Sequence, residues 1–538
     1  MRFIFLFFLC AISHQEVFGQ ASQNWHWKDY ATDSVHGISL HQAYKLIASL
    51  PQKASPIIVA VIDGGIDTNH VALKNLLWTN PKEIPNNNMD DDKNGYVDDL
   101  HGWNFLGGKD GRNIDKAAAE MTRIYHRYKS VYDGKQIDTN QLNAKEKDTY
   151  LIWKQTANEI NVAENDLGAL QYIKMASNAI KKMGAILLKE LPDSNFTTST
   201  LESYQPIGRV TLDTKMAYLR AVKILGIEKE STYPEVVKDL EEYVEGKEKA
   251  ASAKELAPVD IRADIIKDAY FNFSDKYYGN NDITGPNARH GTHVAGLVAS
   301  IPDSSWQVNN LYPALKIMGI RTVPDGDEYD KDIALAIRYA VDQGAKVINA
   351  SFGKKFSPNA SWVQEALQYA ASKDVLFVHA AGNDGLDLDN PENSNYPNDQ
   401  YSLMPSPMND NYVTVGALTP NYGPDMVASF SNYGKGRVDI FAPGDAIYSS
   451  VPNSKYGVEG GTSMAAPAVA GMAAVIRSLY PQLTAVQVKR IILDSGLSVP
   501  MKVRVGEQEL ALSDLCSSGK IANLYTALLL ADQVAGKK

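Results

Sequence analysis

One serine of the chain stands in a setting that suits a nucleophile. Ser463 lies in Gly-Thr-Ser-Met-Ala-Ala-Pro at 461–467, a small-residue run followed by an apolar, helix-forming stretch. A serine at a tight turn into a helix exposes its hydroxyl, and the N–H groups of the first helical turn can face a developing negative charge. Glycine and serine are also the commonest turn residues, so this segment alone is equally consistent with an ordinary turn.

An acid and a histidine precede this serine in equally distinctive settings. Asp63 ends the β-branched run at 57–62, which is typical of a buried parallel strand with its acid at the carboxyl end. His290 stands in Asn-Ala-Arg-His-Gly-Thr-His-Val-Ala-Gly at 287–296, ahead of a small, apolar helical pattern. The chain order Asp, His, Ser is that of subtilisin and differs from the orders of chymotrypsin and the α/β-hydrolases.

These three contexts resemble those of the subtilisin-like serine peptidases, the subtilases. Further blocks at 347–353, 375–384, 427–434 and 440–444 are similar to sequences of the same family in the same order. The resemblance makes Asn383 the side-chain donor of the oxyanion hole. It also implies that substrate is bound by four residues: Ser351, Phe352, Gly353 and Gly382.

The chemistry of such a site is acyl transfer. Ser463 would attack the peptide carbonyl, His290 would take its proton and pass it to the leaving amine, and Asp63 would orient the imidazole. No cofactor is needed for this chemistry. Gly64 departs from the family, in which most members have Ser or Thr after the aspartate, and Ala468 stands where many have His. Neither departure indicates an inactive relative.

His293 lies three residues after His290, a spacing that fits either two helix neighbours or a metal pair. No Glu-x-x-His pattern or cysteine accompanies it. We therefore expect a packed helix histidine.

A second chemistry is suggested by the acidic segment at 90–98. Asp90, Asp92, Asn94 and Asp98 supply oxygens at positions 1, 3, 5 and 9 of a calcium loop, with Gly95 at the bend. His101 occupies the twelfth position, where the complete pattern has Glu. The segment predicts a structural calcium site, and a solvated acidic turn is the alternative.

The predicted fold is α/β, a doubly wound, subtilisin-like parallel sheet with a helical insertion. Buried strands near 57–62, 346–350 and 375–379 alternate with helical patterns, which is the signature of such a sheet. Asp63 and His290 are 227 positions apart, whereas compact subtilases separate these residues by a few tens. The expected domains are a signal peptide at 1–19, a short extension at 20–56, a discontinuous catalytic domain at 57–109 and 266–538, and a helical insertion at 110–265.

The insertion carries an apolar stripe at helical spacing from Ile160 to Leu187. Either a stabilising helical bundle or a lid or regulatory module would show this pattern.

Residues 1–19 have the charged start and short apolar stretch of a signal peptide, which predicts export to the periplasm, the cell surface or the medium. Removing them leaves Cys516 as the remaining cysteine, so no internal disulfide is expected. The net charge of −10 argues against nucleic acid as a partner, and no later run has the length of a membrane span.

The sequence therefore predicts an exported serine endopeptidase that acts on peptide or protein substrates. The alternative from another functional class is a catalytically silent, peptide-binding or regulatory protein that acts through its helical insertion.

Overall fold

The computed structural model describes residues 24–51, 54–165, 167–191, 193–225, 227, 232–299, 314–399 and 410–536. The predicted signal peptide at 1–19 lies outside the described residues. Contacts within the chain define two compact units. Of the described residues, Ile180–Val237 form the smaller unit and the remainder form the larger one.

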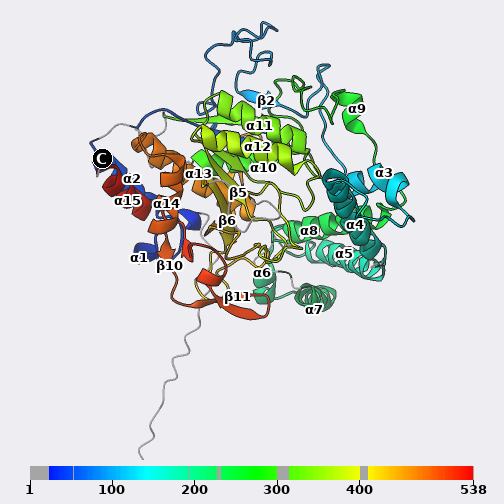
Figure 1. The fold of residues 1–538 in the computed structure, drawn as a ribbon. Coiled ribbons are helices and arrows are strands. Elements are labelled where there is room, and N and C mark those ends of the chain that lie inside the picture. Colours follow the sequence, from blue (N-terminus) through cyan, green and yellow to red (C-terminus); the bar gives the residue numbers. More distant parts are fainter. Residues whose placement is uncertain are drawn as a thin grey trace, which may run out of the picture. The chain divides into compact units, whose positions relative to one another are not determined.

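The larger unit is built on a nine-stranded sheet in the order β10-β13-β7-β6-β5-β4-β1-β3-β2 (Figure 1). Its strands are β1 (Ile57–Asp63), β2 (Gly102–Asn104), β3 (Leu315–Arg321), β4 (Val347–Ala350), β5 (Leu376–Ala380), β6 (Tyr412–Leu418), β7 (Ile440–Pro443), β10 (Leu497–Ser498) and β13 (Lys520–Ile521). Neighbouring strands are parallel except at the edge pair β10–β13. The predicted parallel α/β sheet is confirmed.

Strand β1 lies between β3 and β4, which follow it in the chain on opposite sides. The direction of the winding therefore reverses at β1. In open α/β sheets, sites form at the carboxyl ends of strands where the winding reverses. Asp63 is the last residue of β1 and stands at that point.

Both faces of β1 are buried, which explains its β-branched sequence. Ala60 and Ile62 belong to a core cluster with side chains of α11 (Asp330–Asp342) and α12 (Ala360–Ser372). Because side chains alternate along a strand, Val59 and Val61, also fully buried, face the other side. Helix α10 (Ala288–Ala299) packs on β1, and α13 (Thr462–Leu479) packs on α10 and on β4 to β7.

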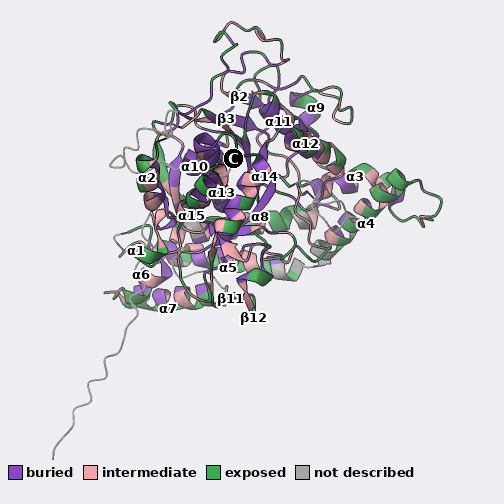
Figure 2. Cartoon of the chain, turned by 60° about the vertical axis from the view of Figure 1, so that its left-hand side comes forward, coloured by how far each residue is buried: buried purple, intermediate pink, exposed green. Residues whose placement is uncertain are grey.

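Helix α13 is a core helix made of small residues. Ala465, Ala466, Ala470 and Gly471 are buried and allow close approach to α10 and the strands. Among the described helices, α13 alone has the length and hydropathy of a membrane span, but 89% of it is buried inside the domain. Figure 2 shows the same burial, with α10 and α13 drawn almost wholly in the colour of buried residues.

The segment preceding β1 also belongs to the larger unit. Helix α2 (Leu40–Ser49) packs against α15 (Leu524–Gly536), and the N–H of Leu524 donates to the Ile38 carbonyl at 2.8 Å. The other elements outside the sheet and the insertion are η1 (Trp25–Trp27), α1 (Tyr30–Asp33), β8 (Ile447–Val451), β9 (Lys455–Glu459), α14 (Ala485–Ser495), β11 (Lys502–Val505), β12 (Gln508–Ala511) and η2 (Leu512–Asp514).

The segment predicted as an insertion, 110–265, is helical in the described residues. Its helices are α3 (Glu120–Tyr132), α4 (Ala144–Asn165), α5 (Leu167–Leu187), α6 (Thr198–Ser203), α7 (Arg209–Ile224), α8 (Tyr233–Ser252) and α9 (Ile261–Ile265). The described residues of 110–179 and 238–265 belong to the larger unit, where Ile114 is fully buried in the core. The smaller unit spans Ile180–Val237, and the predicted domain boundaries stay a prediction.

The smaller unit has its own aromatic core. Phe196 stacks on Tyr233 with ring centroids 5.1 Å apart and meets Tyr218 edge-on at 5.6 Å. Helix α6 begins with a capping box in which Thr197 and Thr200 bond each other's backbone N–H groups.

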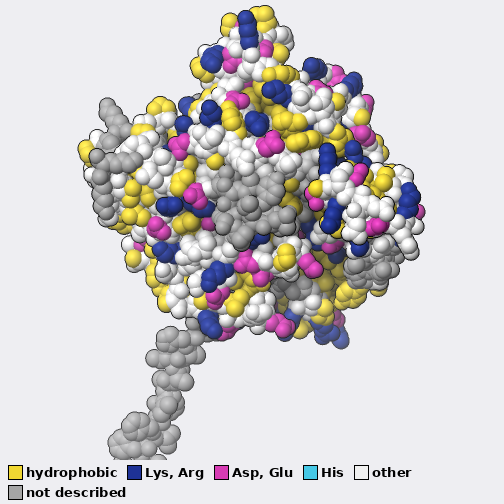
Figure 3. Space-filling view, in the orientation of Figure 1, with side chains coloured by type: hydrophobic (Ala, Val, Ile, Leu, Met, Phe, Trp, Pro, Cys, Tyr) yellow, Lys and Arg dark blue, Asp and Glu magenta, His cyan; other side chains and the backbone are white. Residues whose placement is uncertain are grey.

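Positive and negative side chains are interspersed on the face drawn in Figure 3.

Candidate active site

The structure brings Asp63 and His290 together at the end of β1. Nδ1 of His290 lies 2.9 Å from Oδ1 and 3.0 Å from Oδ2 of Asp63. The carboxylate is buried, and its Oδ1 also accepts the backbone N–H of Gly64 at 2.7 Å. A backbone donor therefore contacts the carboxylate at the position where most subtilases supply a side-chain hydroxyl.

The sequence His290-Gly291 allows α10 to approach β1 closely. A Cβ at position 291 would lie 2.2 Å from the Gly65 carbonyl oxygen and 3.0 Å from Oδ1 of Asp63. Any side chain there would push the helix away from the strand. Gly291 therefore permits the short contact between His290 and Asp63.

Ser463 is presented at the start of α13, as the sequence predicts. It is half-buried between the buried residues Thr462 and Met464. Its Oγ donates to the Ser351 carbonyl at 3.1 Å, and Oγ of Ser351 donates to the Ser463 carbonyl at 2.8 Å. The second bond is explained by Pro467, which lies four residues after Ser463 and has no N–H to give that carbonyl.

Asn383 follows β5 and lies beside the same turn. Its Oδ1 accepts the N–H of Thr462 at 2.8 Å and the Thr462 hydroxyl at 2.9 Å. That hydroxyl also accepts the N–H of Gly382 at 3.0 Å. Because Thr462 engages the amide oxygen, Nδ2 is the atom of Asn383 that can donate to an oxyanion. The sequence did not single out Thr462, although it directly precedes the predicted nucleophile.

The predicted substrate-binding segments face each other across Asn395. The Nδ2 of Asn395 donates to the carbonyls of Ala380 and Ala381 at 3.1 and 3.0 Å. A Cβ on Gly353 would lie 2.2 Å from Oδ1 of the same side chain. Asn395 thus joins the segment at 351–353 to the one ending at Gly382. It lies where the chain resembles its family too weakly for the sequence to assign it.

The surroundings of His290 raise the pKa of its imidazole. Burial lowers the pKa of His290, but the charge of Asp63 and its hydrogen bond outweigh burial and raise the pKa above 6.5. Glu459 of β9, which is ion-paired to Arg289 at 2.7 Å, raises the pKa of His290 further. No sequence pattern links Glu459 to the site.

His293 is a packed histidine, as expected. It is fully buried, and its Nε2 lies 3.0 Å from the Ile447 carbonyl oxygen. Burial lowers the pKa of His293 to about 4, which keeps the ring neutral at physiological pH.

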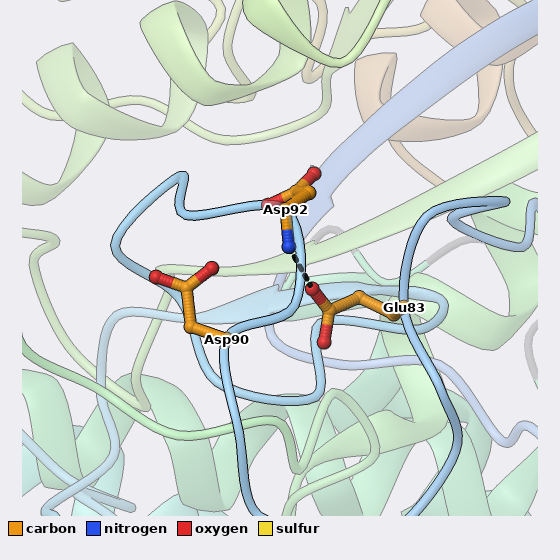
Figure 4. Close-up of side chains that lie close together, drawn as sticks. All are labelled: Glu83, Asp90 and Asp92. Carbon is orange, nitrogen blue, oxygen red and sulfur yellow. Dashed lines mark hydrogen bonds between the residues drawn. The ribbon is translucent and has the colours of Figure 1, made fainter.

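A group of three carboxylates lies in the acidic segment. One oxygen from each of Glu83, Asp90 and Asp92 lies within 4.8 Å of the others (Figure 4). Oε1 of Glu83 accepts the N–H groups of Asp91 and Asp92, whereas its buried Oε2 has no hydrogen-bond partner. A buried, unpartnered carboxylate oxygen beside two others fits a hard cation that takes oxygen ligands.

The other two predicted ligands have different partners. Asp98 accepts the N–H groups of Asn87 and Asn88 at 3.2 and 2.8 Å. Asn94 donates to Asp99 at 3.0 Å and accepts the N–H of Tyr96. The structure thus groups Asp90 and Asp92 with Glu83, which precedes the loop pattern and was not predicted.

Comparisons with known proteins show which proteins the chain resembles in sequence. The thermophilic serine proteinase of Bacillus sp. (strain AK1) is 34% identical over 240 residues, covering 43% of this chain and 53% of that protein. Thermitase of Thermoactinomyces vulgaris is 38% identical over 201 residues, covering 37% and 65%. The chain therefore spans between about half and two thirds of the length of these two relatives.

Among solved structures, a chain from the subtilase cytotoxin SubAB assembly is 26% identical, with a TM-score of 0.37 over 46% of this chain and 78% of that one. The profile of the subtilase family matches residues 54–513, which is most of this chain and includes Asp63, His290 and Ser463. On that match, the chain belongs to the subtilase family, the subtilisin-like serine proteases.

Proposed function

We propose that the chain is a serine endopeptidase that hydrolyses peptide bonds through an acyl-enzyme on Ser463. The observation that carries the proposal is the contact of Nδ1 of His290 with both oxygens of the buried Asp63 carboxylate. This contact leaves Nε2 of His290 as the ring nitrogen that exchanges a proton with the nucleophile and the leaving amine.

Each residue has one role in the proposed reaction. His290 takes the proton of the Ser463 hydroxyl as the oxygen attacks the carbonyl, and Asp63 stabilises the imidazolium that forms. Nδ2 of Asn383 and a backbone N–H at the start of α13 donate to the tetrahedral oxyanion. His290 then protonates the leaving amine, and water releases the acyl group by the same route in reverse.

Probe labelling tests this assignment. A fluorophosphonate should label the wild-type protein at Ser463 and fail to label Ser463→Ala. Ser372→Ala is the matched control, because that hydroxyl lies on α12 and donates to the Tyr369 carbonyl. Cleavage of a peptide library by the wild type then defines the preferred sequences. Equal cleavage by the wild type and Ser463→Ala would refute the proposal, and a protein that neither labels nor cleaves would favour the silent, peptide-binding alternative.

We also propose that Glu83, Asp90 and Asp92 hold a structural Ca²⁺. The support is the buried, unpartnered Oε2 of Glu83 next to the two aspartates. A cation bound only in the folded state would stabilise it by about 2.7 kcal/mol at a hundredfold excess over its dissociation constant.

Thermal melting in Ca²⁺ and in EDTA tests the cation site. Chelation should lower the Tm of the wild type, and Asp92→Asn should reduce that difference. Asp91→Asn is the matched control, because its carboxylate accepts the N–H of Ile84 and lies outside the group of three. If the chelator leaves the Tm of each of the three proteins unchanged, the result would contradict a bound cation.

We propose, finally, that the protein is exported. The pattern of residues 1–19 supports this proposal. Expression of the full chain and of a chain lacking residues 2–19, followed by fractionation, tests it. Both forms remaining in the cytoplasm would contradict export.

A further inference from the structure

Three consecutive residues after the segment at 351–353 contact the helices α3 and α4. Lys354 bonds Glu120 of α3, and Lys355 bonds Glu159 of α4. Phe356 belongs to an apolar cluster with Ile124 and Trp153. The residues that continue the predicted substrate-binding wall are therefore held by α3 and α4. Compact subtilases separate the aspartate and the histidine by a few tens of residues, which leaves no room for these helices.

Lys354 is buried, and its ammonium group makes two hydrogen bonds and one further ion pair. Nζ lies 2.7 Å from Oε2 of Glu120, 2.8 Å from Oδ1 of Asp330 and 2.8 Å from the Glu328 carbonyl oxygen. The side chains of Lys354 and Glu120 are 2% and 5% exposed. The position of the ammonium is therefore defined by three oxygen atoms at once, two of which accept hydrogen bonds.

Glu120 is itself held at the first turn of α3. Nη2 of Arg123 donates to Oε2 of Glu120 at 2.6 Å, and the Glu120 N–H donates to Asp327 at 2.6 Å. Burial raises the pKa of Glu120, but the charges of Arg123 and Lys354 outweigh it and lower the pKa to about 2. Glu120 is therefore charged at neutral pH.

The backbone of Lys354 is coupled to the walls of the substrate site. Its N–H and carbonyl exchange hydrogen bonds with Tyr396 at 3.0 and 2.8 Å. Tyr396 follows Asn395, whose side chain bonds the carbonyls of Ala380 and Ala381 and contacts Gly353. A displacement of Lys354 would consequently move both walls of the site.

We propose that Glu120 is a positioning residue of the peptidase, which acts through Lys354 to hold the segment at 351–353 in the geometry that binds substrate. This inference rests on the proposed function. It assigns α3 a part in substrate binding, because Glu120, at the first turn of α3, bonds Lys354. The adjacent pair Lys355–Glu159 differs from Lys354–Glu120 in burial, with side chains 39% and 41% exposed.

The exposed pair provides a matched control for the test. Glu120→Gln and Glu159→Gln make the same chemical change on neighbouring lysine partners, one buried and one exposed. In the full-length protein, Glu120→Gln should raise KM for a tetrapeptide substrate by about tenfold or more, since small misplacements of binding groups have effects of that size. Glu159→Gln should change KM by less than about twofold, because exposed pairs contribute little.

Two further measurements separate positioning from stability. The rate of fluorophosphonate labelling at Ser463, per folded molecule, should stay near the wild-type rate in Glu120→Gln, because the probe does not need the extended substrate site. The conservative variant Glu120→Asp keeps the charge, and its KM should therefore lie between the values of the wild type and of Glu120→Gln. If Glu120→Gln does not fold, a raised KM in Glu120→Asp supports the proposal and an unchanged KM refutes it.

A lowered Tm with unchanged KM in Glu120→Gln, or equal KM changes in the two Gln variants, would overturn the proposal. Absence of labelling in the wild type would instead refute the proposed peptidase, which is a different result from either of these.

Discussion

Helices α10 and α13 differ from helices α3 and α4 in how they serve the site. The first pair carries His290 and Ser463 and is buried on nearly every side, with Ala and Gly residues at the contacts. The second pair is partly exposed and touches the continuation of the substrate wall through a few buried side chains. The residues proposed to react therefore lie on helices packed on nearly every side, whereas the proposed positioning through α3 depends on one buried ion pair beside an aromatic cluster.

The comparison predicts the largest losses at the packed helices. Ser463→Ala should lower kcat/KM by about 10⁴-fold or more, and Asp63→Asn by about 10⁴-fold, because these residues act with His290 as a unit. The double variant should lose little beyond the worse single variant. Progress curves with a chromogenic peptide measure all three, and additive losses would show that the residues act independently.

A smaller loss is expected at the donor beside α13. Asn383→Ala removes the side-chain donor and should lower kcat by about 10²–10³-fold with KM nearly unchanged, because that bond forms chiefly in the transition state. Asn383 also accepts from Thr462, so Asn383→Asp, which keeps an acceptor and removes the donor, is the control. Full activity in the Asp variant would assign Asn383 to the turn alone.

Much of this site was predictable because its residues lie in local patterns. The β-branched run before Asp63, the glycine after His290 and the small residues around Ser463 each reflect a packing demand of the nearest strand or helix. Asp63 ends a strand, whereas His290 and Ser463 lie in helices, so the prediction of one site came from the chain order Asp, His, Ser and the family resemblance.

The residues that were not predicted depend on distant partners. Glu120 and Lys354 are 234 positions apart, and charged residues are usually exposed, so nothing local marks this pair as buried. Asn395 and Glu459 act through contacts across loops and a hairpin, and Glu83 lies seven residues ahead of the acidic loop that it joins. The domain boundaries stay a prediction, because helical periodicity does not show which helices pack together.

The aromatic cluster of α3 and α4 tests the second half of the comparison. The Trp153 ring is 7% exposed and stacks near Tyr125 at 6.2 Å. Trp153→Ala should destabilise the helix pair α3 and α4 by about 3–5 kcal/mol, the usual cost of removing a buried tryptophan side chain. Hydrogen exchange should then accelerate in α3 and α4 before it does so in α13, and kcat should fall by only a few fold. Uniform acceleration over both pairs of helices would show that they unfold as one unit.

The smallest effect concerns the charge on β9. His290 must be neutral to act as a base, so kcat/KM should rise as the pH passes through its pKa, which lies above 6.5. Glu459 stabilises the protonated ring, and Glu459→Gln should therefore move the rising limb to lower pH. The shift should shrink in about 1 M salt, where the Debye length is about 3 Å. Glu509→Gln on β12 makes the same change of charge and is the control. A shift toward higher pH, or an equal shift in both variants, would show that Glu459 does not act on His290 through its charge.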